Sequence, residues 1–258
     1  MKFGHIRDYV EHVRDDNMAR PVGVLIGDRV QSNAASVDWR AASDPVYDQG
    51  NTNTCVAQAF VGAATLISRI QYAEIEKPSI PALYALSHLI DRPGSPYIPD
   101  DGRRPRSVLE AASRFGLVAN ARWAFGVVDL TIPPPLDVYI HGHIAKLTGW
   151  YRADSGDVVA SLRHALQLGH IPIFAMEVDA DYMNLRGDRV YEGIVGPSYG
   201  SHMQSIEGYD DDRAAFLVRN SWGPTFGDDG YAWVSYKHMR SPNCFDRHVM
   251  TVVPTVIH

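Results

Sequence analysis

The chain has 258 residues, of which 45% are hydrophobic and 21% charged, and its 24 Lys and Arg against 30 Asp and Glu give a net charge of −6. A chain of this length buries roughly 70–75% of its unfolded surface, and its composition excludes a largely disordered or fibrous protein. Its longest run of basic residues is the pair Arg103 and Arg104. This excludes the basic stripe that phosphate-driven nucleic-acid binding needs.

The cysteine content and the hydrophobic pattern indicate the cellular setting. Two cysteines, Cys55 and Cys244, allow at most one disulfide, so we expect a reducing compartment. Residues 1–16 mix acids and bases where a signal peptide has an apolar run, and polar side chains interrupt the longest charge-free segment, 49–68. We therefore expect no standard signal peptide, no membrane insertion, and a place in the cytoplasm or in an intracellular or viral assembly.

The first 36 residues are predicted to form an N-terminal extension ahead of the main domain. Apolar residues at helical spacing predict a short helix between Ile6 and Val13. Pro21, followed by the apolar run 22–26, predicts an extended stretch.

Three helices are predicted beyond this extension. Residues 55–71 are apolar on nearly all sides, which indicates a buried central helix. Residues 107–115 and 155–168 instead place apolar side chains on one face, and each segment is followed by a glycine, Gly116 or Gly169, that can cap a helix.

The C-terminal third changes to short strand-like runs separated by Gly, Pro and Asp. These runs cover residues 171–178, 203–209, 214–219, 231–236 and 249–253. Helices first and strands later predict an α+β protein with two lobes. Chemistry in such a protein often takes place in the cleft between the lobes.

Cys55 is a candidate nucleophile because it lies in the first turn of the predicted central helix. The partial positive charge and free N–H groups of a helix N-terminus lower the pKa of a thiol and so favour the reactive thiolate. The alternative is that Cys55 is a small buried apolar residue, which is the commoner role of an intracellular cysteine.

His202 and Asn220 could complete a catalytic group with Cys55. A cysteine nucleophile needs an imidazole to form a thiolate–imidazolium pair and a third group to orient that ring. Taken singly, His202 could be a surface or core residue, and Asn220 could belong to an ordinary turn after a strand. The order Gln49, Cys55, His202, Asn220 along the chain is what favours the catalytic reading.

These motifs together resemble the papain family of cysteine peptidases. The resemblance covers about residues 37–253 and implies a two-lobed papain-like fold in which a helical lobe with the nucleophile helix faces an antiparallel, β-barrel-like lobe, all within residues 37–258. The matching segments are Val37-Asp38-Trp39-Arg40, Asp48-Gln49-Gly50, Cys55, residues 101–116, Gly200-Ser201-His202, Gly208-Tyr209-Asp210 and Asn220-Ser221-Trp222-Gly223.

The resemblance implies a role for each matched residue. Cys55 would be the nucleophile, His202 the general base and acid, and Asn220 the residue that orients His202. Gln49 and the Cys55 N–H would form an oxyanion hole. Two further residues would border the substrate site: Gly102, from the segment that binds substrate backbone, and Trp222, which would also shield the His202–Asn220 hydrogen bond.

The implied function is hydrolysis of peptide bonds in a protein or peptide substrate, by an endopeptidase without a cofactor or metal. One alternative uses the same residues for amide or acyl transfer. The other is a papain-fold structural or binding component of a larger assembly, such as a virion or secretion machine, with little or no proteolytic activity.

The sequence also departs from the family pattern around the cysteine. The family box Cys-Gly-Ser-Cys-Trp is replaced by Thr52-Asn53-Thr54-Cys55-Val56, and the preceding Tyr47-Asp48-Gln49-Gly50 is similar to a bacterial and viral branch. About 36 residues precede Val37, fewer than the inhibitory segment of secreted members, so zymogen control cannot be assumed. Residues 1–36 could form a strap, bind an assembly partner, or only pack on the domain.

Other motifs are not assigned a function. His141 and His143 have no nearby third ligand for a metal, and the acidic run 210–212 is interpreted as a solvated hairpin turn. Cys244 follows Pro242 and Asn243 without a basic partner and is expected to be a bystander thiol.

Overall fold

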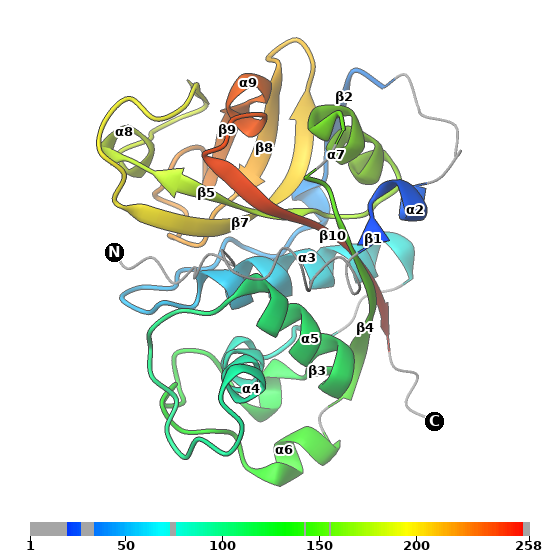
Figure 1. Ribbon diagram of the computed structural model, residues 1–258, viewed down its shortest axis with the longest axis vertical. Helices are drawn as coiled ribbons and strands as arrows, with labels where there is room; N and C mark the ends of the chain where they lie inside the picture. The colour runs from blue at the N-terminus through cyan, green and yellow to red at the C-terminus, as the bar shows by residue number, and fades with distance from the viewer. Residues whose placement is uncertain (1–19, 27–33, 73–75, 142, 155, 255–258) are drawn as a thin grey trace.

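The computed structural model describes residues 20–26, 34–72, 76–141, 143–154 and 156–254, and it has two lobes (Figure 1). Helices dominate the lower lobe, and a sheet with short helices around it forms the upper lobe. The helices of the lower lobe are α3 (Cys55–Gln71), α4 (Ile80–Asp91), α5 (Pro105–Phe115) and α6 (Leu136–His141). The helices of the upper lobe are α7 (Val158–Gln167), α8 (Ala180–Met183) and α9 (Tyr236–Met239).

The strands follow one path in the order β1-β4-β10-β5-β7-β8-β9-β6, with β2 beside β7 and β3 beside β4. Neighbours are antiparallel except for β1 with β4 and β6 with β9. The strands are β1 (Arg20–Pro21), β2 (Ser36–Asp38), β3 (Leu117–Val118), β4 (His143–Arg152), β5 (Ile173–Val178), β6 (Val190–Tyr191), β7 (Gly200–Asp210), β8 (Ala215–Arg219), β9 (Tyr231–Ser235) and β10 (Cys244–Pro254).

The predicted α+β class and two-lobed arrangement are confirmed, but the barrel-like description of the second lobe is wrong. The path ends at β1 and β6, two strands of two residues each that pair with one neighbour only. The sheet is therefore open, since strands this short at separate ends cannot close it. β4 and β10 instead extend from the sheet down the side of the lower lobe and join the two lobes (Figure 1).

The central helix α3 lies in the core, between the two lobes. It spans the predicted residues 55–71, and 14 of its 17 residues are buried against β7, β10, α4 and α5. Its buried hydroxyls bond inside the helix, from Thr65 Oγ1 to Val61 O at 2.8 Å and from Ser68 Oγ to Ala64 O at 2.9 Å. These bonds leave an apolar outer surface that packs on both lobes.

Two further predicted helices are present with shifted starts. α5 begins at Pro105 and ends at Phe115. Gly116 caps it with a φ of +74°, a conformation that favours glycine, and its N–H bonds Ala112 O at 3.1 Å. α7 begins at Val158, later than predicted, because Asp157 caps it by accepting a bond from Ala160 N at 3.2 Å.

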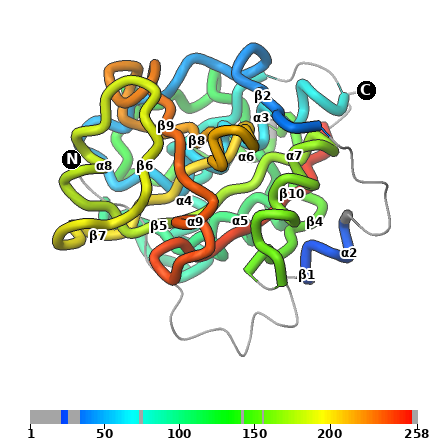
Figure 2. Tube along the Cα trace, turned by 90° about the horizontal axis from the view of Figure 1, so that it is seen from above, coloured from blue at the N-terminus to red at the C-terminus, as the bar shows by residue number. Residues whose placement is uncertain are grey.

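The extension differs from its prediction where it is described. The run 22–26 is not extended: α2 (Gly23–Ile26) is a short helix, and only β1 before it is a strand. Val22 is buried, but Val24 is 57% exposed, so the run has no continuous face to pair with the sheet. β1 and α2 lie beside β4 (Figure 2), and Val22 N donates to Arg152 O at 2.8 Å. The predicted helix at 6–13 lies outside the described residues.

The end of the extension also bonds to the domain. Tyr209 Oη donates to Ala34 O at 2.8 Å, and Asp211 N donates to Ala35 O at 2.9 Å. Ser36 then pairs with Asp210 as β2 joins the sheet. A boundary at residue 36 stays a prediction, because described parts on its N-terminal side already pack on the domain.

Several elements were not predicted from the sequence, and the longest of them are α4 and β4. α4 is buried on nearly all sides, and its start is set by Ser79, which accepts a bond from Ala82 N at 3.1 Å, followed by Pro81. β4 alternates in burial only around Ala145 and Leu147, so it lacks a strand-like pattern. Among the described helices, none is both long and apolar enough to cross a membrane.

Candidate active site

Cys55 is the first residue of α3, as predicted, and its side chain is fully buried. Thr54 precedes it as the N-cap, and the first turn of α3 contains no acidic residue that would oppose a thiolate. Gln58 N donates to Thr54 O at 2.9 Å, which closes this first helical turn. The structure therefore places the thiol where the partial positive charge of the helix N-terminus favours an anion.

His202 and Asn220 lie together on adjacent strand segments, His202 within β7 and Asn220 directly after β8. His202 Nε2 is 2.8 Å from Asn220 Oδ1, and both side chains are buried. Ser221 N also donates to Asn220 Oδ1, at 2.7 Å. A backbone N–H can only donate, so this second bond identifies the Asn220 atom as the oxygen.

This identification fixes the tautomer of His202. Asn220 Oδ1 accepts only, so the hydrogen in the 2.8 Å contact belongs to His202 Nε2. In a neutral imidazole one ring nitrogen carries the hydrogen and the other is the base. Nδ1 is therefore the nitrogen of His202 that can take up a proton.

Trp222 covers one face of the His202 ring. The two rings are stacked with centroids 4.5 Å apart and planes at 25°. Phe226 and Tyr182 hold the indole through edge contacts at 5.0 and 5.9 Å. Because Trp222 is only 6% exposed, it excludes water from the imidazole. The packing of Tyr182 and Phe226 on Trp222 was not predicted, because Tyr182 lies far from the other two residues in sequence.

Gln49 is bound to the loop that carries Asn220 and Trp222. Its backbone N donates to Ser221 O at 2.9 Å, and Ser221 Oγ donates to its Oε1 at 2.6 Å. Gln49 Nε2 donates to Thr52 O at 2.8 Å. These bonds orient the buried amide so that its oxygen faces Ser221 and its nitrogen faces the turn before Cys55.

A buried ion pair between Arg219 and Glu207 lies next to the chain segment that precedes Gln49. Arg219 is 3.8 Å from the carboxylate of Glu207 and donates to Ser43 Oγ, Asp44 O and Pro45 O at 2.6, 2.7 and 2.8 Å. These bonds fix the chain that leads into Gln49.

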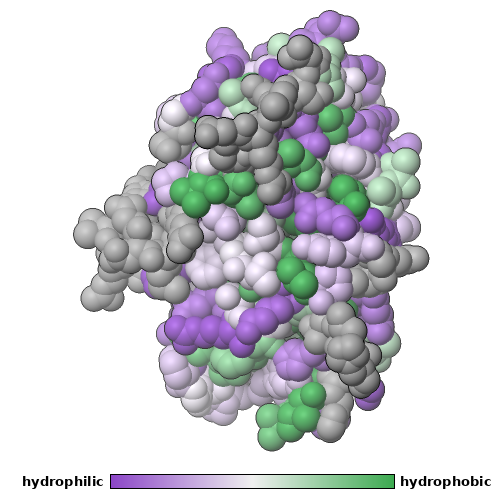
Figure 3. Space-filling model, turned by 90° about the vertical axis from the view of Figure 1, so that its right-hand side faces the viewer, coloured by the Kyte–Doolittle hydropathy of each residue, from purple (hydrophilic) through white to green (hydrophobic). Residues whose placement is uncertain are grey.

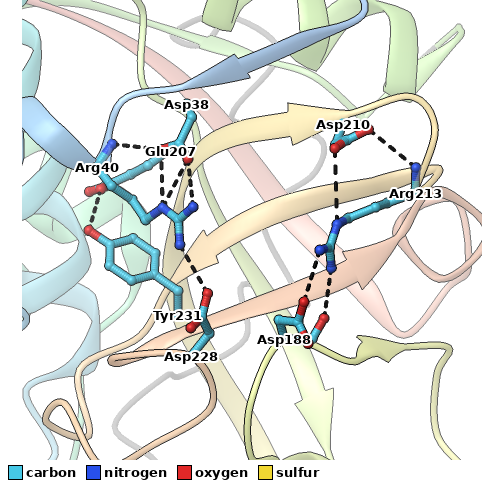
Figure 4. Close-up of polar contacts among 8 residues, drawn as sticks. All are labelled: Asp38, Arg40, Asp188, Glu207, Asp210, Arg213, Asp228 and Tyr231. Atoms are coloured by element: carbon cyan, nitrogen blue, oxygen red, sulfur yellow. Dashed lines mark hydrogen bonds and ion pairs between the residues drawn. The ribbon is translucent and has the colours of Figure 1, made fainter.

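Glu207 has further contacts at the same place. Tyr231 Oη donates to it at 3.0 Å (Figure 4). Burial raises the pKa of Glu207, against the lowering effect of Arg219. This ion pair was not predicted from the sequence, because Glu207 and Arg219 belong to different strands, β7 and β8, that become neighbours only in the folded chain.

Gly102 follows Asp100, which bonds to the loop before Cys55. Its φ is +90°, and its N–H bonds Tyr84 Oη at 3.2 Å. The guanidinium of Arg103 stacks 3.6 Å from the Tyr84 ring and bonds Gly102 O at 2.5 Å.

The Gly102 segment is connected to the cysteine loop through Asp100. Asn53 N donates to Asp100 Oδ1 at 2.8 Å, and Asn53 Nδ2 donates to Asp100 O at 2.6 Å. Asn53 stands two residues before Cys55. The structure thus brings the Gly102 segment beside the start of α3, as it brings Gln49 beside Asn220.

Cys244, the second cysteine of the chain, does not belong to this group of residues. It is a free, buried thiol on β10, paired in register with Met176 of β5. Burial raises its pKa to about 12. A thiol with this pKa is almost wholly protonated near neutral pH and does not act as a nucleophile. No group of three or more His, Cys, Asp or Glu side chains within the described residues could hold a metal ion.

Comparison with known proteins points to one family. A family model described as papain family cysteine protease matches residues 141–251, which include His202 and Asn220, whereas Gln49 and Cys55 precede the match. An uncharacterized peptidase C1-like protein of Acanthamoeba polyphaga mimivirus is 25% identical over 215 residues, 76% of this chain and 66% of that protein. Papaya proteinase 4 of Carica papaya is 24% identical over 239 residues, 91% of this chain and 65% of that protein.

Solved structures show the same fold. Xylellain, a cysteine protease from Xylella fastidiosa, superposes with a TM-score of 0.79 over 96% of this chain and 95% of that chain, at 23% identity. A cysteine protease of Carica candamarcensis in complex with E-64 gives a TM-score of 0.66 over 86% and 98% of the two chains, at 19% identity. The chain spans about two thirds of the length of the curated relatives named above. In sequence and in fold, the chain is therefore similar to the papain family of cysteine proteases.

Proposed function

We propose that the chain is a cysteine endopeptidase that hydrolyses peptide bonds in protein or peptide substrates. The observation that carries the proposal is the His202 Nε2 to Asn220 Oδ1 bond of 2.8 Å under Trp222, on a strand that packs against the helix beginning at Cys55. This bond directs the basic Nδ1 of His202 away from Asn220. The chain therefore carries a nucleophile, an oriented base and an amide donor.

The first step is attack by the Cys55 sulfur on the scissile carbonyl carbon. His202 Nδ1 accepts the thiol proton, and the thiolate is stabilised by the imidazolium and by the N-terminus of α3. The carbon–sulfur bond forms as the carbonyl electrons move to the oxygen. Asn220 keeps the ring aligned during this proton transfer, and Trp222 limits competition from water.

The oxyanion formed in this step needs hydrogen-bond donors. The Gln49 amide nitrogen has two hydrogens, one of which bonds Thr52 O, and we assign the other, with the Cys55 backbone N–H, to the oxyanion. Each preorganised donor of this kind contributes about 3–4 kcal/mol of transition-state stabilisation. Ser221 and Thr52 hold the Gln49 amide in the required orientation.

The reaction ends in two further transfers. His202 gives its proton to the leaving amine as the carbon–nitrogen bond breaks, which leaves an acyl thioester on Cys55. Water then attacks the thioester carbonyl while His202 Nδ1 accepts its proton. The acid product leaves, and the thiol is restored. Backbone groups near Gly102 would align the substrate chain beside Cys55.

Cleavage of a mixed peptide library tests this proposal. The wild-type chain should cut peptides, and Cys55→Ala should leave only cuts attributable to contamination. Gln49→Ala serves as a matched variant that keeps the thiol, and its rate should fall by about 10²–10³-fold. Equal cleavage by the wild type and Cys55→Ala would contradict the proposal and leave the structural role as the better one.

A role of residues 1–36 in binding an assembly partner stays a prediction. The described residues of this segment bond to β4, β7 and the β7–β8 turn of their own domain. Removing residues 1–35 should lower the melting temperature; faster alkylation of Cys55 as well would indicate that the segment also restricts access to the thiol.

A further inference from the structure

The lower lobe contains a second pocket, remote from Cys55. It has a volume of about 680 Å³ and lies between the C-terminal halves of α4 and α5, α6 and the start of β4. Pockets of roughly 300–1,000 Å³ are the usual size for small-molecule ligands. In Figure 1 these elements meet at the foot of the molecule, whereas the loop before α3 lies at the left. The residues that line it include Leu86, Leu89, Phe115, Leu136, Tyr139 and Lys146.

The lining combines an apolar interior with basic side chains. Arg114, His143 and Lys146 are its charged or titratable members, and no carboxylate lines it. This contrasts with the chain's overall charge of −6. Arg114 forms an ion pair with Glu110, whereas exposed Lys146 has no acidic partner within the described part of the chain. The pocket therefore offers a positive charge to a ligand.

The hydroxyl of Tyr139 is a second polar group at this pocket that could bond a ligand. Its hydroxyl oxygen is buried and has no hydrogen-bond partner among the described residues, although the ring lines the pocket. Burial raises the pKa of Tyr139, so the hydroxyl stays protonated and can donate. Buried polar groups in folded proteins nearly always have a partner. A ligand oxygen would provide it once the Tyr139 side chain turns its hydroxyl toward the pocket, because the oxygen is closed off from solvent in the free chain.

The mouth of the pocket is also apolar. Leu136 is 72% exposed, Ile140 on the same helix is 57% exposed, and Phe115 is 44% exposed. Figure 3 shows hydrophobic residues at the surface of the lower end of the molecule, at the level of α6 in Figure 1. Exposed apolar residues gathered around a pocket are typical of a binding site.

We propose that the pocket between α4, α5, α6 and β4 binds a medium-chain acyl carboxylate, with its hydrocarbon chain against the leucines and its carboxylate near Lys146 and Tyr139. A carboxylate matches the lining because it accepts bonds from both an ammonium and a phenol. A hydrocarbon chain matches the rest of the lining, which has few other polar groups. This site is independent of the peptidase chemistry.

Calorimetric titration of the full chain with decanoate tests the proposal, using the Cys55→Ala variant in parallel to exclude any effect of the thiol. Decanoate should bind with one site per chain in both proteins and should raise the melting temperature. Decanol and decyltrimethylammonium have the same chain length with a neutral or a positive head. Both should bind at least tenfold more weakly than decanoate.

Two variants separate specific binding from general hydrophobic adsorption. Lys146→Glu should reduce decanoate affinity at least tenfold, whereas Lys237→Glu, an exposed lysine of α9 in the other lobe, should not change it. Tyr139→Phe removes only the hydroxyl that has no partner. Its melting temperature without ligand should equal or exceed that of the wild type, while decanoate affinity should fall about five- to tenfold.

Three results would overturn the proposal. The first is no saturable decanoate binding, and the second is decanol binding as tightly as decanoate. The third is an equal loss of affinity in Lys146→Glu and Lys237→Glu. Two other results would assign this face to a different occupant. A dimer in sedimentation that Leu136→Asp dissociates would assign the face to a second copy of the chain. Decanoate binding that appears only after residues 255–258 are removed would assign the face to that segment.

Discussion

The hydrogen bond from Ser221 Oγ to Gln49 Oε1, at 2.6 Å, gives a sharp prediction about the oxyanion hole. Ser221→Ala removes this bond but keeps the Ser221 backbone N–H, which bonds Asn220 Oδ1. The His202–Asn220 pair is therefore left intact. The change acts only on the orientation of the Gln49 amide.

The size of the effect follows from the energy of one bond. A neutral hydrogen bond contributes about 1–1.5 kcal/mol, which equals about five- to tenfold in the ratio of correctly oriented to misdirected amides. We expect kcat to fall about five- to tenfold in Ser221→Ala. KM should stay within about twofold, because the oxyanion interaction is made in the transition state.

A double-mutant cycle measures this coupling directly. Steady-state kinetics on one fluorogenic peptide would compare wild type, Ser221→Ala, Gln49→Ala and the double variant. In the Gln49→Ala background, Ser221→Ala should have almost no further effect on kcat/KM. A further five- to tenfold loss in that background would contradict the prediction, since Ser221 would then act without Gln49.

Three other perturbations have definite expected outcomes. Asn220→Ala should lower kcat/KM at least tenfold, as measured by steady-state kinetics. It should also lower the free energy of unfolding in urea by about 1–3 kcal/mol, because the buried N–H groups of His202 and Ser221 lose their acceptor. Cys244→Ala should leave kcat/KM unchanged and leave one alkylable thiol, counted by mass spectrometry; a loss of activity would contradict the bystander role. Burial lowers the pKa of His238 below its ordinary 6.5. As pH drops below about 6.5, the unfolded chain therefore takes up this proton before the folded chain does, and the free energy of unfolding should fall. Urea unfolding of His238→Gln should show a shallower fall between pH 7 and 5, and a fall equal to that of the wild type would contradict this assignment.

Local pattern was enough to predict the elements that position the chemistry. The all-round apolar pattern of residues 55–71 identified α3 with its bounds, and Cys55 at its first turn. The apolar runs between Gly, Pro and Asp identified the segments of β5, β7, β8, β9 and β10. These signals are local, so they needed no knowledge of the tertiary structure.

The features that the sequence missed depend on distant contacts or on incomplete patterns. The bond between Gln49 and Ser221 and the ion pair between Glu207 and Arg219 both join segments that meet only after folding. α4 is buried nearly all round and was hidden among loop signals, although Ser79 and Pro81 are a readable N-terminal signal. The barrel-like form of the second lobe was inferred from the family resemblance, whereas the way a sheet curves and ends depends on strand pairing that no local pattern encodes.

The proposed chemistry depends on activation of Cys55 by an oriented His202. The most direct measurement is the rate of iodoacetamide alkylation of Cys55 as a function of pH in the Cys244→Ala variant. Activation by His202 predicts fast alkylation of Cys55 well below pH 7 and loss of this low-pH reactivity in His202→Ala. Alkylation that rises only near pH 8.5, the range of an ordinary thiol, and that His202→Ala does not change would contradict it.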